Sequence, residues 1–244
     1  SKKINTLIQQ KLKNPEKKLT IQQSIELLTT CVQQGNEKAQ EIQEKEAIIV
    51  IGNTGAGKST ITQIIKLILN YRYNLKVVYF SIDDFYKTLK ERSKLSNNVH
   101  KLFKTRGVPG THDTKLLKKI FFDLVKKKFR PVLIPIFDKS KDDRVPKKKW
   151  KKIYKQPQII IFEGWCVGAM PQKNRNLIKS INILEKKEDS KLIWRNKVNK
   201  ELKHEYRKIF NKIDRLIFLK IPNFECVYKW RLLQEKKLQL TSKS

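Results

Sequence analysis

A glycine-rich segment of the sequence has the composition of a phosphate-binding loop. The residues AIIVIGNTGAGKST, positions 47–60, place an apolar run before the pattern Gly-x-x-x-x-Gly-Lys-Ser and an apolar helical pattern after it. Glycines let backbone amides wrap around phosphates, and the N-terminus of the following helix faces their negative charge. We expect Lys58 to reach the β- and γ-phosphates of a nucleotide and Ser59 to bind Mg²⁺. The predicted nucleotide-binding residues are Gly52, Asn53, Thr54, Gly55, Ala56, Gly57, Lys58, Ser59 and Thr60.

Acidic residues follow two other apolar runs, in positions suited to phosphoryl transfer. Asp83 comes shortly after VVYFS, and a carboxylate beside a phosphate loop can accept the proton of an attacking hydroxyl. We expect Asp83 to be this base and Asp84 to cap a helix. Glu163 follows IIIF, where an acidic residue can hold Mg²⁺ directly or through water. Gly164 would permit a close approach of the backbone.

The reaction class follows from the motifs that accompany the loop. We expect no guanine-reading segment of the NKxD type and no further signature segments of motor or transporter ATPases. A small-molecule phosphotransferase that uses ATP and Mg²⁺ is then the simplest class. Two further charged segments lie between Asp84 and Glu163: Arg106–Asp113 (RGVPGTHD) and Pro135–Arg144 (PIFDKSKDDR).

Four segments together resemble one enzyme family. SIDDFY, RGVPGTHD, PIFDKSKDDR and FEGW are similar to motifs of the D-glycerate 3-kinase family of plants, cyanobacteria and fungi. That family belongs to the P-loop kinases, with uridine kinase, phosphoribulokinase and pantothenate kinase. The resemblance spans Ala47 to Leu240, and it implies ATP-dependent phosphorylation of the primary hydroxyl of D-glycerate to 3-phosphoglycerate. The alternatives are a kinase for a uridine- or pantothenate-like alcohol, a nucleic-acid-associated NTPase, and an inactive nucleotide-binding remnant.

The resemblance implies that Arg106–Asp113 and Pro135–Arg144 form the site of the phosphate acceptor, and we call them the acceptor segments. It makes Asp83 the catalytic base and assigns acceptor binding to Arg106, His112, Asp113, Asp138, Lys139 and Arg144. A carboxylate substrate needs a cation, for which Arg106 or Arg144 would serve. The hydroxyl that is not phosphorylated needs an acceptor, for which Asp113 or Asp138 would serve. His112 equally suits a structural histidine.

The last apolar pattern of the chain resembles a kinase lid. Within the helix predicted over residues 222–240, the resemblance implies that Arg231, or else Lys229, closes over the phosphates. The complete catalytic set is then Lys58, Asp83 and Arg231, and the predicted metal ligands are Ser59 and Glu163.

Apolar runs that alternate with helical patterns predict an α/β fold. We expect one P-loop NTPase-type domain over residues 1–244, with a parallel sheet covered by helices on both faces. Residues 1–46 are expected to form a helical extension, because apolar residues recur at helical spacing from Ile21 to Val32. The chain ends at Ser244, before a further helix and a fifth strand that the resemblance implies, so the sequence is either a fragment or a trimmed domain. Extended segments are expected at 47–51, 76–80, 131–136, 158–162 and 215–219, and helices at 59–69, 114–125, 191–210 and 224–240.

The chain is strongly basic. Lys and Arg number 55 and Asp and Glu 23, so the net charge is 55 − 23 = +32. Because the lysines are spread through almost every segment, we expect no specific nucleic-acid partner and instead a general attraction for anions. No apolar run is long enough to span a bilayer, and Cys31, Cys166 and Cys226 have no paired spacing. These features predict a cytoplasmic protein, or a plastid protein if the source is an alga.

Overall fold

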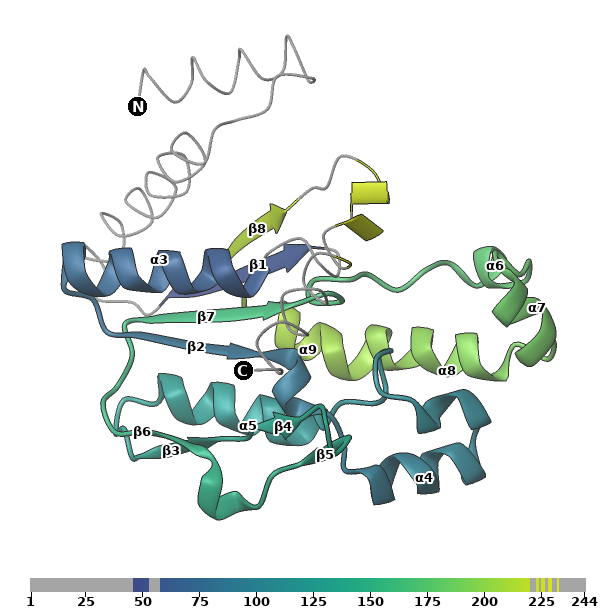
Figure 1. Ribbon diagram of the computed structural model, residues 1–244, viewed down its shortest axis with the longest axis horizontal. Coiled ribbons are helices and arrows are strands. Elements are labelled where there is room, and N and C mark those ends of the chain that lie inside the picture. Colours follow the sequence, from purple (N-terminus) through teal and green to yellow (C-terminus); the bar gives the residue numbers. More distant parts are fainter. Residues whose placement is uncertain are drawn as a thin grey trace, which may run out of the picture.

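The core of the molecule is a parallel sheet. The computed structural model describes residues 46–52 and 58–219, together with positions 223, 225, 226, 228, 229 and 232 (Figure 1). Four strands pair in the order β2-β7-β1-β8, and all three pairings are parallel. Their bounds are β1 Glu46–Gly52, β2 Val77–Ser81, β7 Ile159–Gly164 and β8 Arg215–Leu219. The sequence-based prediction of an α/β fold with this sheet is confirmed.

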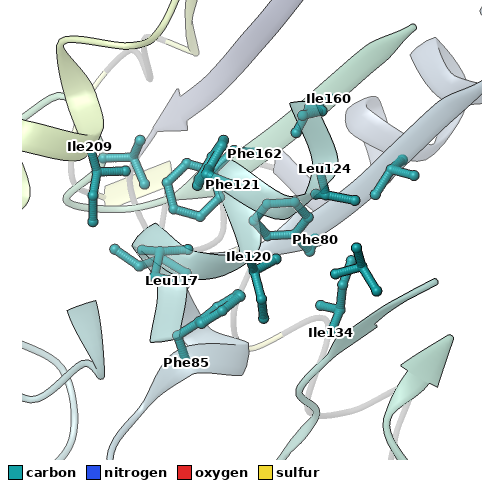
Figure 2. Close-up of a cluster of buried hydrophobic side chains, with 14 of the residues drawn as sticks. Phe80, Phe85, Leu117, Ile120, Phe121, Leu124, Ile134, Ile160, Phe162 and Ile209 are labelled. Atoms are coloured by element: carbon teal, nitrogen blue, oxygen red, sulfur yellow. The ribbon is translucent and has the colours of Figure 1, made fainter. Parts of the chain in front are cut away.

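Helices cover both faces of the sheet because successive strand residues point to opposite sides. Val77, Ile159 and Ile161 face helix α3 (Lys58–Tyr73), which contributes Ile65 and Leu69 to that side of the core. On the opposite face, the buried residues come from β2, β7, α5 (Thr114–Val125) and α9 (Arg207–Phe210). That set includes Val78, Phe80, Leu117, Ile120, Leu124, Ile160, Phe162 and Ile209 (Figure 2).

An aromatic cluster joins α5 to the sheet next to the candidate site. Phe80, Phe85, Phe121 and Phe162 have neighbouring ring centroids between 5.2 and 5.6 Å apart, in tilted or edge-on geometry. Such pairs contribute about 0.5–1.5 kcal/mol each beyond the burial of their area. Because Phe85 ends the turn that carries Asp83 and Asp84, this cluster fixes the backbone of that turn.

In Figure 1, helices α4, α6, α7 and α8 extend beyond the carboxyl ends of the strands, and β3 and β6 lie beneath α5. The helices are α4 Leu89–Asn98, α6 Asn174–Leu177, α7 Ile183–Glu188 and α8 Ile193–Glu201. Two small antiparallel pairs are β3 Val132–Ile134 with β6 Lys151–Ile153, and β4 Phe137–Asp138 with β5 Asp143–Arg144. Short helical turns occupy Ile82–Phe85, Lys101–Lys104 and Lys147–Lys149. Within the described ranges, every helix is too short or too polar to cross a membrane.

The prediction of one long helix over residues 191–210 is wrong in two respects. It begins at Ile193, because Leu192 has a left-handed backbone (φ 62°) and the Asp189 carboxylate accepts hydrogen bonds from the first-turn amides of Trp194 and Arg195 (2.8 and 3.0 Å). It is also interrupted by a π-helical turn, Leu202–Tyr206, before α9. The predicted extension over 1–46 lies outside the described residues except for Glu46. The predicted lid over 222–240 is described at six positions, of which 225, 226, 228, 229 and 232 are helical.

Candidate active site

The candidate site lies where the parallel strands end. Ile51 of β1 pairs with Gly164, and Ser81 of β2 pairs with Glu163, so the carboxyl ends of three strands meet at one edge. Ligands of open α/β sheets bind at this edge. Gly52 ends β1 and Lys58 begins α3 there. The loop Asn53–Gly57 between them, the side chain of Thr60, and Arg231 lie outside the described residues, so their predicted roles stay predictions.

Glu163 lies in the half of the candidate site that is predicted to bind the phosphates of the nucleotide, which we call the phosphate side. It is buried, and its Oε1 lies 3.4 Å from both the Ser59 hydroxyl, on the first turn of α3, and the Tyr79 hydroxyl, on β2. Burial, followed by the charge of Glu163, raises the pKa of Tyr79 to about 12. Tyr79 was not among the predicted site residues, although its hydroxyl within the apolar run VVYFS was an available signal.

The donor set at this point fits Mg²⁺. A carboxylate and a hydroxyl that face each other offer the oxygen ligands that Mg²⁺ prefers. In the part of the chain that the structure describes, no group of three or more His, Cys, Asp or Glu side chains could hold a metal ion. Mg²⁺ in nucleotide sites is usually held by one or two protein oxygens together with substrate phosphates and water, and Ser59 with Glu163 has that character.

Lys58 lies in the electric field of both halves of the site. Burial is the main cause that lowers the pKa of its ammonium. The negative charges of Glu163 and Asp83 partly oppose that effect, and the positive charge of Lys139 adds to it. The candidate phosphate-binding lysine is therefore close to the candidate base and to a cation of the acceptor segment.

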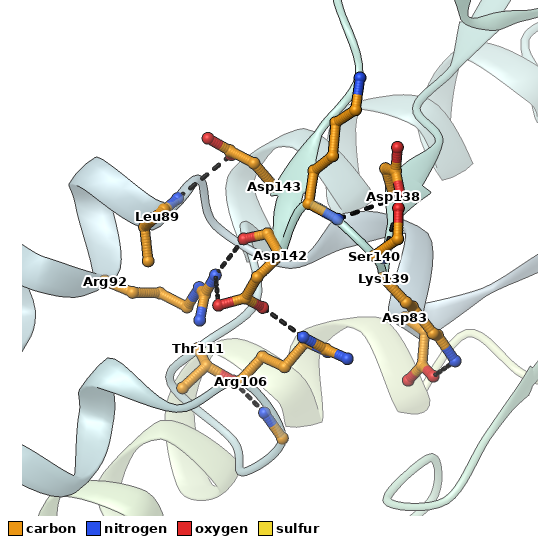
Figure 3. A network of polar contacts seen from close by, with 12 residues as sticks. Asp83, Leu89, Arg92, Arg106, Thr111, Asp138, Lys139, Ser140, Asp142 and Asp143 are labelled. Carbon is orange, nitrogen blue, oxygen red and sulfur yellow. Dashed lines mark hydrogen bonds and ion pairs between the residues drawn. The ribbon is translucent and has the colours of Figure 1, made fainter.

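The turn after β2 gives its two aspartates different roles. Ser81, rather than Asp84, is the N-cap: its hydroxyl accepts a hydrogen bond from Asp83 N (3.2 Å), and Asp84 Oδ2 accepts one from Ser81 N (3.2 Å). This reciprocal capping box corrects the prediction that Asp84 is itself the cap. Burial raises the pKa of Asp84 to about 6. Asp83 is instead bound by Lys139, whose Nζ lies 2.8 Å from its Oδ2 (Figure 3).

The hairpin that carries Lys139 is fixed by Asp138. Asp138 Oδ1 accepts hydrogen bonds from the backbone amides of Ser140 (2.9 Å) and Lys141 (3.3 Å) and from the Ser140 hydroxyl (2.5 Å). These bonds hold the turn between β4 and β5. The structure therefore uses Asp138 to shape the turn, whereas the sequence analysis offered it as an acceptor for a substrate hydroxyl.

Arg106 lies outside this hairpin but belongs to a charged network centred on Asp142 in the hairpin turn (Figure 3). It pairs with Asp142, which also accepts a bond from Arg92 at 2.9 Å. Arg92 is fully buried and donates to three backbone carbonyls, those of Lys87, Lys104 and Asp142. A buried charge is tolerated only with such partners. Arg92 was not predicted to belong to the site, because a lone arginine in a charged helix gives no signal of burial.

Arg144 and Asp113 contact each other and hold neighbouring elements together. Asp113 is the N-cap of α5, where its Oδ1 accepts a hydrogen bond from Leu116 N at 3.0 Å. Arg144 donates to the carbonyl of Tyr86 (2.8 Å) and lies 3.4 Å from Asp113 Oδ2. Both predicted acceptor-binding residues thus already have partners within the protein.

His112 is fully buried, which favours the structural alternative left open for it. Its ring stacks on Tyr86 with centroids 4.4 Å apart, and its Nδ1 lies 2.6 Å from the Tyr206 hydroxyl. The Tyr206 oxygen also accepts a hydrogen bond from Gly110 N (3.0 Å). Tyr206 is the last residue of the π-helical turn, and no motif of the sequence predicted its contact with a segment 94 residues earlier.

We expect the free energy of unfolding of the wild-type protein to fall by about 2 kcal/mol more than that of His112→Gln between pH 7 and pH 5. Burial lowers the pKa of folded His112 to about 3, below its usual value of 6.5. The unfolded state therefore binds more protons between these values, and stability rises with pH across that window. The stabilisation is complete above pH 6.5 and is lost as the pH falls toward 3. Urea unfolding at both pH values measures the difference.

The comparison with His112→Gln is needed because Asp84 changes the free energy of unfolding with pH in the opposite direction. Its raised pKa makes the folded state bind more protons between pH 3.8 and about 6, so its contribution to stability falls as the pH rises. Both proteins keep Asp84, and both keep Asp83 and Lys87, the charged groups that act on His112. Identical pH dependence of the two proteins would contradict a buried, neutral His112.

One sequence expectation fails at the opposite edge of the sheet. Asn211–Asp214 reads NKID, so a segment of the NKxD type is present after all. It directly precedes β8, which runs parallel to β1. It therefore lies at the amino ends of the strands, away from Lys58 and Glu163, and is not placed to read a nucleotide base.

Comparisons with known proteins agree with this geometry. The model of the phosphoribulokinase/uridine kinase family matches residues 47–222. Over 225 residues the chain is 36% identical to a protein named uncharacterized kinase mug58 from Schizosaccharomyces pombe, with 88% of this chain and 79% of that protein covered. Over 192 residues it is 30% identical to the chloroplastic D-glycerate 3-kinase of Arabidopsis thaliana, with 74% of this chain and 39% of that protein covered.

Solved structures give the same result. The YGR205w protein matches with a TM-score of 0.69 and 31% identity, over 88% of this chain and 75% of that one. A D-glycerate 3-kinase from Cryptococcus neoformans matches with a TM-score of 0.70 and 25% identity, over 82% and 72% of the two chains. The resemblance to D-glycerate 3-kinases noted from the motifs is thus confirmed in sequence and in structure. The chain belongs to the phosphoribulokinase/uridine kinase family and has the fold of its P-loop kinases.

Proposed function

We propose that the protein transfers the γ-phosphoryl group of ATP to the primary hydroxyl of D-glycerate, giving 3-phosphoglycerate. The hydroxyl oxygen forms a bond to the γ-phosphorus while the bond between that phosphorus and the β–γ bridging oxygen breaks. The hydroxyl proton passes to Asp83, and ADP is the leaving group.

The observation that carries this proposal is the contact between Lys139 and Asp83. It brings a cationic segment within hydrogen-bond distance of a candidate base, at the edge of the sheet that also holds Lys58, Ser59 and Glu163. A small hydroxy acid needs a base near its hydroxyl and a cation near its carboxylate, and glycerate fits both requirements.

The phosphate side of the site would hold ATP. Lys58 would offset charge on the β- and γ-phosphates, and Ser59 and Glu163 would hold Mg²⁺. When bound, Mg²⁺ neutralises charge on the phosphate oxygens. Arg231 would close over the same phosphates. The further ATP-binding residues in this proposal are Gly52, Asn53, Thr54, Gly55, Ala56, Gly57 and Thr60.

Two kinds of relative support glycerate as the acceptor. Proteins named D-glycerate 3-kinase match this chain in sequence and in structure. The Schizosaccharomyces pombe relative, at higher identity, is named a kinase without a named acceptor.

The net charge of the protein also favours this proposal. Both ATP and glycerate are anions, and a net charge of +32 attracts anions in general.

The test is ADP release with Mg²⁺-ATP and each of D-glycerate, L-glycerate, uridine, pantothenate or no acceptor. We expect turnover that depends on D-glycerate. Turnover with uridine or pantothenate and not with glycerate would replace the acceptor. ADP release that needs no acceptor and rises with RNA or DNA would contradict a small-molecule kinase.

A further inference from the structure

The acceptor segments contain three cations that could bind a substrate carboxylate, and their contacts differ. Arg144 is held by the Tyr86 carbonyl and by Asp113, and its side chain is only 11% exposed. Arg106 is paired with Asp142, which the buried Arg92 also holds. Each arginine therefore already binds a carboxylate of the protein. For either one, binding a substrate carboxylate would mean giving up that partner.

Lys139 differs from both arginines in its setting. Its side chain is 61% exposed, and the partner that the structure gives its ammonium is Asp83, at 2.8 Å (Figure 3). Exposed ion pairs of this kind contribute little to stability and exchange readily. The backbone of Lys139 is nevertheless fixed, because Asp138 holds the turn at Ser140 and Lys141. The ammonium of Lys139 can therefore change partner while the backbone of Lys139 stays in place.

The ion pair conflicts with the role proposed for Asp83. A base must come within about 2.6–3.2 Å of the hydroxyl whose proton it takes. The ammonium of Lys139 occupies one oxygen of that base and stabilises its negative charge. A neutral acceptor has nothing to offer Lys139 in exchange. An acceptor with a carboxylate does.

Resting on the proposed function, we propose that Lys139 is the residue that binds the carboxylate of the acceptor, and that this exchange releases Asp83 to act as the base. The acceptor carboxylate takes the place of Asp83 on the ammonium. The freed Asp83 then receives the proton of the primary hydroxyl as the new oxygen–phosphorus bond forms. Binding of the acceptor carboxylate and release of Asp83 are then one event. A neutral acceptor therefore binds more weakly and, once bound, is also phosphorylated more slowly.

The test compares D-glycerate with D-glyceramide, which keeps both hydroxyls and replaces the carboxylate by a neutral amide. For the wild-type protein we expect a preference for the acid of 100-fold or more in kcat/KM, on the order seen when a charged hydrogen bond is lost. In Lys139→Met we expect the KM for D-glycerate to rise at least tenfold. We expect kcat/KM for D-glyceramide to be unchanged or higher, because Asp83 no longer has to be released.

Lys141→Met is the matched control. It removes the same charge two residues away on the same turn, so it measures general attraction of the acid by the basic surface. We expect its preference for acid over amide to stay within threefold of the wild type. Lys139→Arg should restore part of the preference, because it keeps a cation at that position.

The outcomes separate this inference from the proposed function. If wild-type protein phosphorylates D-glycerate while Lys139→Met keeps the wild-type KM and preference, the inference is overturned and the proposed function stands. If Lys139→Met slows both acceptors equally, Lys139 acts on the phosphates instead, and the inference is again overturned. If wild-type protein phosphorylates none of the acids, the proposed function fails at the first step. Calorimetry then decides the inference by itself: D-glycerate that binds equally to wild type and Lys139→Met overturns it.

Discussion

Replacing Asp83 with Asn should reduce kcat for the phosphorylation of D-glycerate by about 10²–10⁴-fold, the usual contribution of a positioned general base. The change keeps the shape of the side chain and removes its ability to take up a proton. Binding of ATP should be little affected, because Asp83 belongs to the turn after β2 and not to the loop between β1 and α3. ADP release measures turnover, and calorimetry with ATP measures nucleotide binding.

Asp84→Asn is the matched control for this variant. The two residues are adjacent, but the Asp84 carboxylate accepts the backbone amide of Ser81, a bond that an asparagine oxygen can also accept. We expect Asp84→Asn to keep most of the turnover. Near-normal turnover in Asp83→Asn, or an equal loss in both variants, would contradict Asp83 as the base.

Replacing Gly164 with Ala should destabilise the protein by about 3 kcal/mol, at the upper end of the costs of overpacking a core. A Cβ at this position would overlap Cγ2 of Ile82 and lie 2.7 Å from Cγ2 of Val167. Both neighbours are fully buried, so neither can move into open space. Urea unfolding followed by circular dichroism measures the loss of stability.

A double-mutant cycle identifies the cause of that loss. Ile82→Ala removes the methyl group that the new Cβ would overlap, so the two changes together should cost less than the sum of their separate costs. Gly168→Ala is a comparison in which the nearest atom to a new Cβ, Leu216 Cδ1, is 3.8 Å away but the backbone has a left-handed φ of +78°. Strict additivity of Gly164→Ala and Ile82→Ala would contradict the steric explanation.

Close packing at Gly164 also links stability to the site. Ile82 directly precedes Asp83, and Gly164 directly follows Glu163. A shift of either backbone would move a carboxylate of the candidate site. We therefore interpret Gly164 as the position that sets the separation of the turn after β2 from the end of β7.

The strands and the site edge could be predicted from the sequence because their signals are local. Buried parallel strands read as continuous apolar runs, and β8 begins and ends at the predicted residues. The acidic residues at the carboxyl ends of β2 and β7 then have to share one edge, because parallel strands end on the same side. Helix α5 was also predicted with its observed bounds, since its amphipathic pattern and its cap, Asp113, both lie within the segment itself.

The contacts that could not be predicted join segments that are far apart in the sequence. Strand β6 begins within the basic run KKKWKK at positions 147–152, because pairing with β3 outweighs the poor strand propensity of lysine. The π-helical turn brings Tyr206 to His112 and Gly110, and no local pattern announces it. The sequence also could not show that Asp138 shapes its own turn or that the Tyr86 carbonyl already binds Arg144.

The order of the strands has a consequence for synthesis of the chain. Strand β7 lies between β1 and β2, and its first residue, Ile159, pairs with Glu46, which is 159 − 46 = 113 residues earlier. On a ribosome, β1 and β2 are complete long before β7, the strand that pairs with both, so their edges stay open until β7 has been made. Pairing over such sequence distances is slow and leaves open edges exposed to aggregation. The strands that carry the phosphate loop and the candidate base should therefore depend on protection by chaperones until β7 has left the ribosome.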